Sequence, residues 1–219
     1  MATEWISPTW RMPQVNNQSK FENYSLDFDG TEFIDLGSDT TLELTSDFSV
    51  SVWIKESGSL NRGIICCGDR NNGSGWHIYR TSTNKVAFNL YTANSRTATS
   101  TTSVNTGNWI NVIATFEKNG NTAFYINNAT TGTSSTSTMT TFSYTTGSWE
   151  LGRRATHANN YADITVHYVR WWNGYALSAS DVASLYTNRS EVNYSDWIIP
   201  TVTQPTFDWN FRQTVSAGG

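Results

Sequence analysis

Residues 63–76 hold the side chains of this chain that most resemble a chemical site. Two adjacent cysteines are followed by a glycine-rich loop that carries Asp69, Asn71 and Asn72. Short oxygen-bearing side chains at this spacing can ligate Ca²⁺ or contact a sugar or an anion, and they are also the favoured residues of ordinary turns. One carboxylate supplies little charge for binding Ca²⁺. A plain turn is therefore the favoured interpretation, with a Ca²⁺ site and a sugar or anion contact as the two alternatives.

The two cysteines are predicted to be packing residues of a short apolar strand. Neighbours on a strand point to opposite faces, so a disulfide between Cys66 and Cys67 would strain the backbone. The chain has no other cysteine, and we interpret both as unpaired thiols that indicate folding in a reducing compartment. Arg70 is the only basic residue beside them in sequence, although His77 or Arg80 could come near in the fold. A thiol active site is not predicted.

Aromatic side chains form a second set of candidate binding residues. Their rings can stack on pyranose rings while Asn, Asp and Arg contact the hydroxyl groups. If Trp171 and Trp172 lie on one strand, they point to opposite faces and cannot both face the core. One of them should therefore be exposed or covered by a helix or a tail. The alternative is that most of these aromatics are core or tail contacts. The candidate glycan-binding residues are Trp53, Trp76, Tyr79, Tyr91, Trp171 and Trp172.

Apolar residues recur with a period of two from residue 24 onward, which predicts antiparallel strands. The segments FSVSVWI (48–54) and KVAFNLY (85–91) each place apolar side chains on one face. A strand at 110–116 is followed by Asn119-Gly120, a pair that suits the positive φ angles of a tight hairpin turn, and by a return strand through Phe124 and Ile126. Further strands are predicted at 25–28, 33–36, 41–44, 63–67, 76–80, 149–152 and 164–172.

One segment, ALSASDVASLY (176–186), predicts a helix. Ser178 and Asp181 form a capping-box pattern, and the apolar residues Leu177, Val182 and Leu185 could face one side of the helix. About a dozen short strands and one late helix together predict an all-β fold of two packed sheets.

The two ends of the chain differ from its middle. Residues 1–23 and 188–219 lack sustained periodicity, yet they carry large aromatic side chains, which mark contact surfaces when they are exposed in clusters. We therefore divide the chain into an N-terminal arm (1–23), a domain (24–187) and a C-terminal arm (188–219). The arms either fold back on their own sandwich or clasp a neighbouring subunit. The candidate assembly contacts are Trp5, Trp10, Trp197, Phe207, Trp209 and Phe211.

Charge and hydropathy argue against two classes of partner. The formal net charge is −4 and no basic run exceeds Arg153-Arg154, so the positive surface of a nucleic-acid binder is not expected. No stretch of eighteen apolar residues predicts a membrane span, and the N-terminus lacks the basic start and apolar run of a signal peptide. Either the chain is mature as written or a signal has been removed.

Five segments, in this order, resemble the laminin-G-like modules of the concanavalin A-like jelly roll. They are NYSLDFDGTEFIDLG, FSVSVWIK, GNWINVIATFEKNGNTAFYINN, WELG and VRWWNGYALSASDVASLY, within residues 24–187. The resemblance implies a jelly-roll sandwich of two curved antiparallel sheets, here with one short C-terminal helix and extended N- and C-terminal arms. It also implies a concave face that often binds carbohydrate or protein, and in many members a Ca²⁺ ion held at the rim by acidic and Asn side chains.

Several family features are absent from the sequence. The last strand reads Val-His-Tyr-Val-Arg at 166–170, where the family often has an Asp-Glu pair before Val-Arg, which argues against a Ca²⁺ site of that type. Glycoside hydrolases of this jelly roll carry carboxylates spaced as Glu-x-Asp-x-x-Glu or a close variant, and the chain has no such triplet. The pentraxin cysteine pair is also missing. We therefore predict no enzymatic activity and no required cofactor, with Ca²⁺ at Asp69, Asn71 and Asn72 as the alternative.

These observations favour a structural or adhesion module. We expect a virion surface protein, either a capsid decoration or a tail-associated protein, whose aromatic arms dock on neighbouring capsid or tail subunits or on a second copy of the chain. Its jelly roll would face outward and could bind polysaccharide. Unpaired thiols and a surface rich in Ser, Thr and Asn fit assembly in cytoplasm followed by release. The alternative is a secreted or cell-surface lectin or adhesin in the extracellular space, with or without Ca²⁺.

Overall fold

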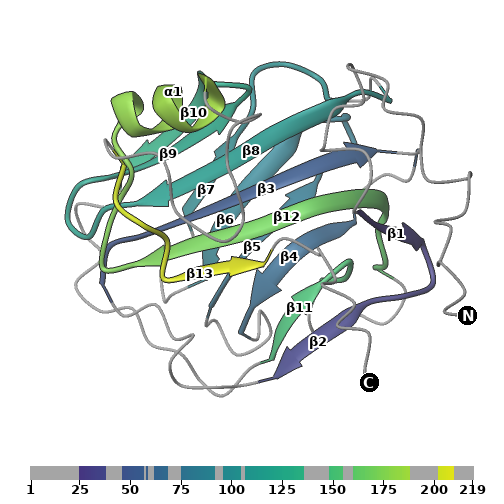
Figure 1. The fold of residues 1–219 in the computed structure, drawn as a ribbon. Coiled ribbons are helices and arrows are strands. Elements are labelled where there is room, and N and C mark those ends of the chain that lie inside the picture. The colour runs from purple at the N-terminus through teal and green to yellow at the C-terminus, as the bar shows by residue number, and fades with distance from the viewer. Residues whose placement is uncertain are drawn as a thin grey trace, which may run out of the picture.

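The computed structural model describes residues 25–37, 46–56, 58, 62–68, 75–91, 96–104, 107–135, 148–154, 160–187 and 202–209. Within these segments the chain forms two antiparallel sheets and one helix, α1 (Ala179–Thr187) (Figure 1). The predicted all-β sandwich is confirmed. α1 is too short to cross a membrane.

The seven-stranded sheet is organised around the long strand β12, which pairs with three other strands. Its order is β1 (Leu26–Asp29), β12 (Asp163–Asn173), β3 (Phe48–Glu56), β8 (Trp109–Phe116), β9 (Asn121–Ile126) and β10 (Ala129–Ser135). A short strand, β13 (Phe207–Trp209), pairs with the later half of β12, whereas β1 pairs with its earlier half. Strands distant in sequence therefore meet at β12.

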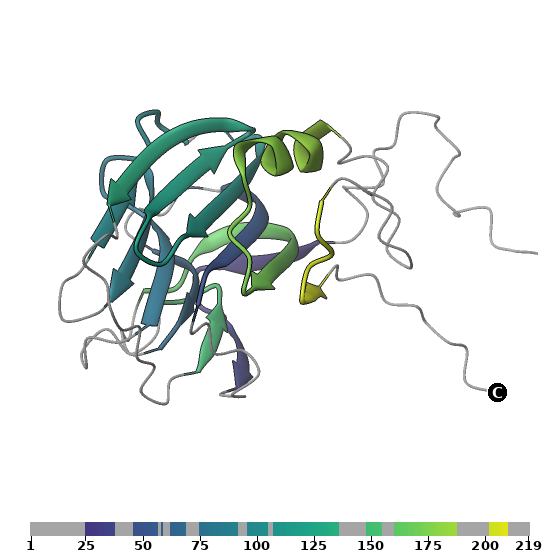
Figure 2. The ribbon, with the colours of Figure 1, turned by 90° about the vertical axis from the view of Figure 1, so that its left-hand side faces the viewer.

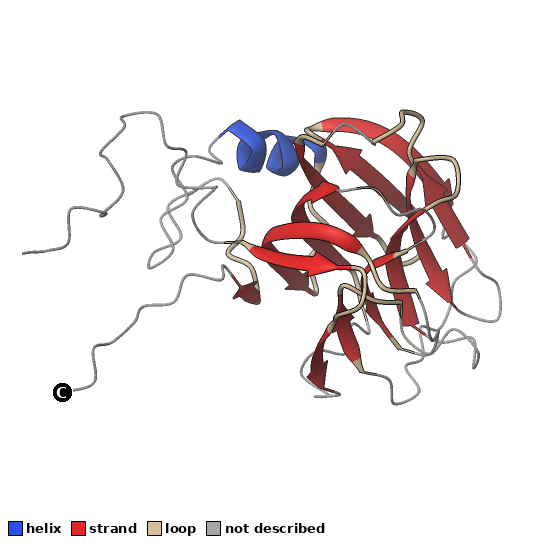
Figure 3. Cartoon of the chain, turned by 90° about the vertical axis from the view of Figure 1, so that its right-hand side faces the viewer, coloured by secondary structure: helices blue, strands red, loops and turns tan. Residues whose placement is uncertain are grey.

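The six-stranded sheet packs against the seven-stranded one. Its order is β2 (Ile34–Gly37), β11 (Trp149–Leu151), β4 (Gly63–Cys67), β5 (Gly75–Arg80), β6 (Val86–Tyr91) and β7 (Arg96–Thr99). Figure 3 shows the strands in red, with α1 outside the sandwich. β4 matches its predicted bounds, and β5 and β6 agree with theirs to one residue.

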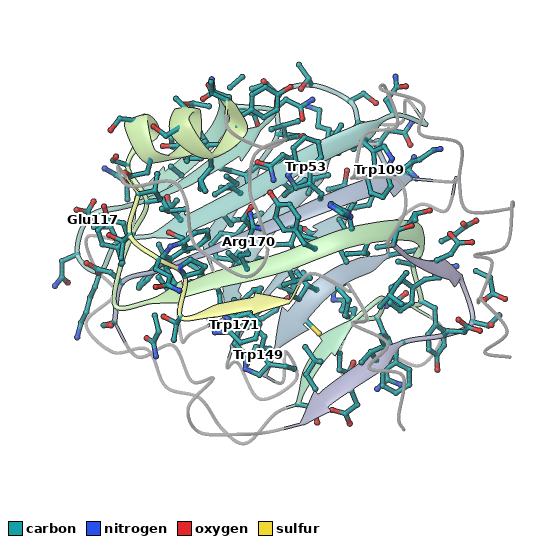
Figure 4. The ribbon with its side chains drawn as sticks, viewed as in Figure 1. Trp53, Trp109, Glu117, Trp149, Arg170 and Trp171 are labelled. Carbon is teal, nitrogen blue, oxygen red and sulfur yellow. The ribbon has the colours of Figure 1, made fainter. Side chains whose placement is uncertain are left out.

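The core lies between the sheets and is rich in aromatic rings. Phe48 of β3 stacks on Phe116 of β8 with ring centroids 5.2 Å apart. Trp149 of β11 stacks on Trp171 of β12 at 4.5 Å, so this pair joins the two sheets (Figure 4). Burying a large apolar side chain contributes about 1.5–3 kcal/mol, which makes this aromatic layer a major source of stability.

A β-bulge in β12 explains why its apolar pattern changes phase. Val166 pairs with Ile54 and Val169 pairs with Val52, so two residues, His167 and Tyr168, lie opposite Trp53 alone. The extra residue lets Val166 and Val169 both face the core, although their spacing is odd. The strand predicted at 164–172 is confirmed, and the bulge accounts for its irregular alternation.

The helix covers the outer face of the seven-stranded sheet. Val182 and Leu185 pack with Trp172 in a second apolar cluster, so Trp171 faces the core while Trp172 lies beneath α1. The capping box is confirmed, because Ser178 N donates to Asp181 Oδ2 at 2.8 Å and Asp181 N donates to Ser178 Oγ at 3.2 Å. Figure 2 shows α1 and β13 on the same side of the sandwich.

β8, β9 and β10 form two consecutive hairpins that share β9. Asn119 takes φ of 61° in the predicted turn, and Gly120 N donates to Glu117 O at 3.1 Å. The next turn, between β9 and β10, places Asn127 and Asn128 at φ of 49° and 72°. Two positive φ angles at the centre of a two-residue loop are the geometry of a type I′ turn. This hairpin, and the strands β7, β10 and β13, were missed by the sequence analysis.

Part of the segment assigned to the C-terminal arm belongs to the sandwich. β13 pairs with β12, from Trp209 opposite Val169 to Phe207 opposite Trp171. Val202 is buried in the cluster beneath α1, and Trp172 Nε1 donates to Thr203 O at 2.6 Å. Residues 202–209 thus fold back on their own domain. The other assembly candidates, Trp5, Trp10, Trp197 and Phe211, and the strand predicted at 41–44, lie outside the described residues.

Candidate functional site

The outer face of the six-stranded sheet carries a line of polar side chains. Because successive side chains of a strand alternate between faces, residues that separate core positions point outward; His77, for example, lies between the core residues Trp76 and Ile78. The pairing registers set six such residues opposite one another from β2 to β7. We call this set the polar row: Asp35, Glu150, Cys66, His77, Asn89 and Thr97. Its three central members, Glu150, Cys66 and His77, are at most 4% exposed, whereas Asp35 and Thr97 at its ends are exposed.

A small cavity lies beside the polar row, where β4 ends and β5 begins. Its volume of about 10 Å³ has room for one water-sized group. We call it the Arg154 cavity. Its walls are Cys66, Cys67, Gly68, Trp76, His77, Tyr91 and Arg154.

A hydrogen-bonded chain lines this cavity. Arg154 Nη2 donates to Tyr91 Oη at 2.9 Å, and Tyr91 Oη lies 3.2 Å from His77 Nε2. Since arginine only donates, the tyrosine oxygen accepts from Arg154 and its own proton is available to His77. This assignment favours a neutral imidazole with its proton on Nδ1.

The same side chains also form an aromatic stack. The His77 ring lies 4.8 Å from the Tyr91 ring at an angle of 26°, and 4.4 Å from the Tyr79 ring. The Arg154 guanidinium carbon lies 5.4 Å from the centre of the Tyr79 ring, within the range of a cation–π contact. Tyr79 is half-buried, so part of its ring meets solvent at the edge of the site.

Arg154 is a buried cation that forms no ion pair with a carboxylate of the described residues. It is 9% exposed, its Nε has no hydrogen-bond partner, and its one side-chain hydrogen bond in the described structure goes to Tyr91. Burying a charge is costly unless it is compensated. The guanidinium therefore leaves positive potential at the wall of the cavity.

The preceding residue, Arg153, is compensated. Its Nε donates to Glu150 Oε2 at 2.9 Å, its Nη2 donates to Glu150 Oε1, and its guanidinium carbon lies 3.5 Å over the Phe33 ring. Hydrogen bonding to Glu150 raises the pKa of Arg153 above its usual range. The negative charge of Glu150, the carboxylate of the polar row beside Cys66, is thus directed to Arg153 rather than Arg154.

The cysteines have the opposed orientations that the sequence predicted. Cys67 packs in the core, whereas Cys66 faces outward opposite His77, so the expectation that His77 could approach the cysteines is confirmed. Both cysteines are buried, and neither forms a disulfide. Cys66 Sγ donates to Arg153 O at 3.4 Å, a contact that favours the thiol over the nucleophilic thiolate.

Five of the six aromatic candidates are at most 7% exposed, which corrects their prediction as sugar-stacking residues; of these five, Tyr91 is buried at the wall of the Arg154 cavity. Trp76 and Trp171 lie in the core at 1% and 0% exposure, because both sit at inward positions of their strands. Trp172 lies beneath α1. Trp53 faces outward from the seven-stranded sheet, but its ring stacks on Tyr186 with centroids 6.1 Å apart, and the residue is only 6% exposed.

The other two candidates, Tyr79 and Tyr91, come together at the Arg154 cavity. The structure brings them together with His77 and Arg154, which the sequence analysis did not select. His77 was considered only as a neighbour of the cysteines, and Arg154 only as part of a basic pair. The alternation of core and non-core residues along each strand could have shown that these side chains point outward. Only the order of the strands in the sheet shows that they lie next to one another.

The proposed Ca²⁺ residues Asp69, Asn71 and Asn72 lie outside the described residues, but both ends of their loop are fixed. Gly68 lines the Arg154 cavity. Gly75 takes φ of 92°, and a Cβ atom there would lie 2.0 Å from Cys67 O, so only glycine fits this position. In the described part of the chain, no group of three His, Cys, Asp or Glu residues could hold a metal ion.

Comparison with known proteins extends these observations. Residues 28–183 match the model of the concanavalin A-like lectin/glucanases superfamily. No curated protein sequence matches the chain significantly. The binding domain of botulinum neurotoxin serotype G is similar in structure, with a TM-score of 0.58 and 18% identity over 77% of this chain and 43% of that one.

Two further structures show the same likeness. A native heptameric SAP-like pentraxin from Limulus polyphemus has a TM-score of 0.56 and 16% identity, over 74% of this chain and 81% of that one. The binding domain of botulinum neurotoxin DC, solved in complex with rat synaptotagmin II, has a TM-score of 0.57 and 18% identity, over 75% and 41%. The chain spans less than half of the neurotoxin domains, and at these identities the likeness shows the jelly-roll fold alone. Because the family model covers most of the chain and agrees with the observed sandwich, the protein belongs to the concanavalin A-like lectin/glucanase superfamily.

Proposed function

We propose that this protein is a non-enzymatic module that binds carbohydrate on the outer face of its six-stranded sheet. The observation that carries the proposal is the Arg154 cavity, where a buried cation, a hydrogen-bonded Tyr91–His77 pair and the half-buried Tyr79 ring converge. Aromatic faces with a few convergent polar groups are the usual composition of a sugar site. Membership of a lectin-containing superfamily supports the same ligand class.

The carboxylates of the polar row support binding rather than hydrolysis. A glycoside hydrolase needs one carboxylate as acid and a second as base or nucleophile. Glu150 and Asp35 lie opposite each other, but Glu150 is paired with Arg153 and Asp35 Oδ1 accepts a hydrogen bond from Gly37 N at 2.8 Å. The structural neighbours are likewise binding domains and a pentraxin.

A glycan array probed with the full chain tests this function. We expect binding to at least one polysaccharide class, weakened about five- to tenfold by Tyr79→Ala because a stacking ring is lost. Lys118→Gln, an exposed change at the β8–β9 turn, is the control and should bind as the wild type does. Absence of any bound glycan, or binding that Tyr79→Ala leaves unchanged, would contradict the proposal.

The place of action is a second part of the proposal. We propose display on a virion surface, as a capsid decoration or tail-associated protein; the extracellular lectin or adhesin is the alternative. Two buried cysteines that form no disulfide support folding in a reducing compartment. Since residues 202–209 are used within the domain, contacts with neighbouring subunits are assigned to residues 1–23 and the remainder of the C-terminal arm.

Trimming the arms tests this assignment. Deleting residues 1–23 and 210–219, together with Trp197→Ala, preserves β13 and should abolish attachment to a particle or to a second copy while leaving glycan binding intact. Attachment can be followed by co-sedimentation with the particle, and self-association by analytical ultracentrifugation. Unchanged attachment of the trimmed chain would contradict the role of the arms.

A further inference from the structure

We propose that the Arg154 cavity receives the carboxylate group of an acidic sugar, so that the ligand of the polar row is a uronate-containing polysaccharide. This inference rests on the proposed carbohydrate-binding function and names its ligand class.

The charge of the cavity favours an anion. Arg154 is nine-tenths buried, lines the cavity and has no carboxylate partner among the described residues. Glu150 is held by Arg153, and Tyr91 and His77 contribute no negative charge when both are neutral. A ligand carboxylate is the group that would complete this environment, since guanidinium–carboxylate pairs make strong charge-assisted hydrogen bonds.

The size of the cavity favours a carboxylate over a bulkier anion. With a volume of about 10 Å³ it has room for one oxygen-sized group and not for a sugar ring. A planar carboxylate can insert one oxygen edge-on toward a guanidinium. A sulfate or phosphate ester presents a tetrahedral head, which is wider at every orientation. The ring that bears the inserted group must remain outside.

The surroundings provide a place for that ring. Tyr79 is half-buried, and its ring lies beneath the Arg154 guanidinium at 5.4 Å. A sugar anchored by its carboxylate at Arg154 would therefore rest against the open part of Tyr79. The polar row continues from the buried His77 to the half-buried Asn89, whose Oδ1 is covered, and to Thr97, whose exposed side chain can contact a further unit of a chain.

The test compares two polymers that differ only at the carboxyl group, which is charged and bare in one and neutral and methylated in the other. Binding of the full-length protein to polygalacturonate and to its fully methyl-esterified form is measured by calorimetry at one salt concentration. We expect esterification, and separately Arg154→Gln, to weaken binding about tenfold to a hundredfold, the range for losing a hydrogen bond to a charged group. Lys118→Gln removes one exposed positive charge elsewhere and should change affinity less than twofold. A sulfated polysaccharide of similar length should bind more weakly than polygalacturonate.

Each outcome decides the proposal. Loss on esterification together with loss in Arg154→Gln supports it, and the ester comparison uses wild-type protein, so it stands even if the variant does not fold. Equal binding of acid and ester overturns it while the carbohydrate function survives. Tighter binding of the sulfated polymer through Arg154 overturns the choice of carboxylate. If a neutral glycan alone binds, the acidic ligand is wrong; if no saccharide binds, both proposals fall.

Discussion

Glu56 and Arg80 form an ion pair that links the two sheets inside the sandwich. Arg80 Nε lies 2.9 Å from Glu56 Oε2, and both side chains are at most 3% exposed. Glu56 extends the inward-facing positions of β3, and Arg80 those of β5. Burial raises the pKa of Glu56 to about 7, although the charge of Arg80 acts in the opposite direction. A buried pair of this kind contributes little net stability relative to apolar residues, but removing one partner is costly.

The stability of the protein should therefore depend on the protonation of Glu56. Its pKa is about 7 when folded and 4.5 when unperturbed, so between these values the folded state binds the extra proton. Stabilisation is full below pH 4.5 and is lost as pH rises through 7. Urea unfolding of the wild type and of Glu56→Gln between pH 4.5 and 8 should show a fall in stability that the variant lacks. Parallel pH profiles would contradict this assignment.

Tyr91 is expected to position Arg154, because its hydroxyl oxygen accepts the hydrogen bond from Arg154 Nη2. Tyr91→Phe removes the oxygen that accepts from Arg154 Nη2 but preserves the ring that stacks on His77. Binding of an acidic glycan should weaken about three- to tenfold, as expected for one lost hydrogen bond. The melting temperature should also fall by about 2–10 °C, because the buried Arg154 guanidinium loses its acceptor. Titration of the His77 imidazole by NMR provides a second readout, because its Nε2 loses its neighbour. An unchanged His77 titration together with unchanged affinity would rule out the positioning role.

At the scale of elements, the sequence signal was strongest where local chemistry determines structure. The β8–β9 hairpin, the buried strand β4 and the capped helix α1 were predicted because alternation, Asn119-Gly120 and Ser178 with Asp181 are local patterns. β10 was missed because its sequence, ATTGTSS, is polar and its turn is Asn-Asn without glycine. The phase change at the bulge of β12 follows from pairing with β3, which no local pattern shows.

Gly75, the first residue of β5, tests whether the close approach of the backbone to Cys67 O requires glycine. Gly75→Ala combines a positive φ of 92° with a contact of 2.0 Å to Cys67 O, whereas Gly37→Ala has a similar φ of 81° and no atom within 4 Å. Gly37→Ala should cost about 1 kcal/mol of unfolding free energy. Gly75→Ala should cost at least ~2 kcal/mol more, because the backbone must also move. Chemical denaturation measures both, and equal losses would contradict the close approach.

The capping box provides a matched prediction for α1. Ser178→Ala removes the oxygen that accepts from Asp181 N and should lower the unfolding free energy by about 1 kcal/mol. Thr187→Ala, an exposed change in the last turn and away from the cap, is the control and should be near neutral. The difference in urea midpoint between the two variants checks the cap. Equal midpoints would show that the cap does not stabilise the folded protein.

At the scale of the molecule, the sandwich could be predicted from the sequence but the candidate site could only be half predicted. Tyr79 and Tyr91 were selected as aromatic candidates, yet the same rule selected Trp76 and Trp171, whose rings are in the core. Aromatic residues near strands do not reveal which face they occupy when a bulge or a short strand shifts the register. Arg154 follows β11, and it reaches Tyr91 of β6 because β11, β4, β5 and β6 are neighbours in the sheet.

The central claim is that carbohydrate binds on the six-stranded sheet at Arg154 and not on the face of the seven-stranded sheet that carries Trp53. The most direct measurement is an NMR titration of the full chain with the best glycan from the array, following the side-chain N–H signals of Arg154, Trp53 and Trp172. The proposed site predicts a large, saturable shift of the Arg154 Nε–H signal and none at the two indoles. Shifts at Trp53 or Trp172 with an unmoved Arg154 signal would contradict it.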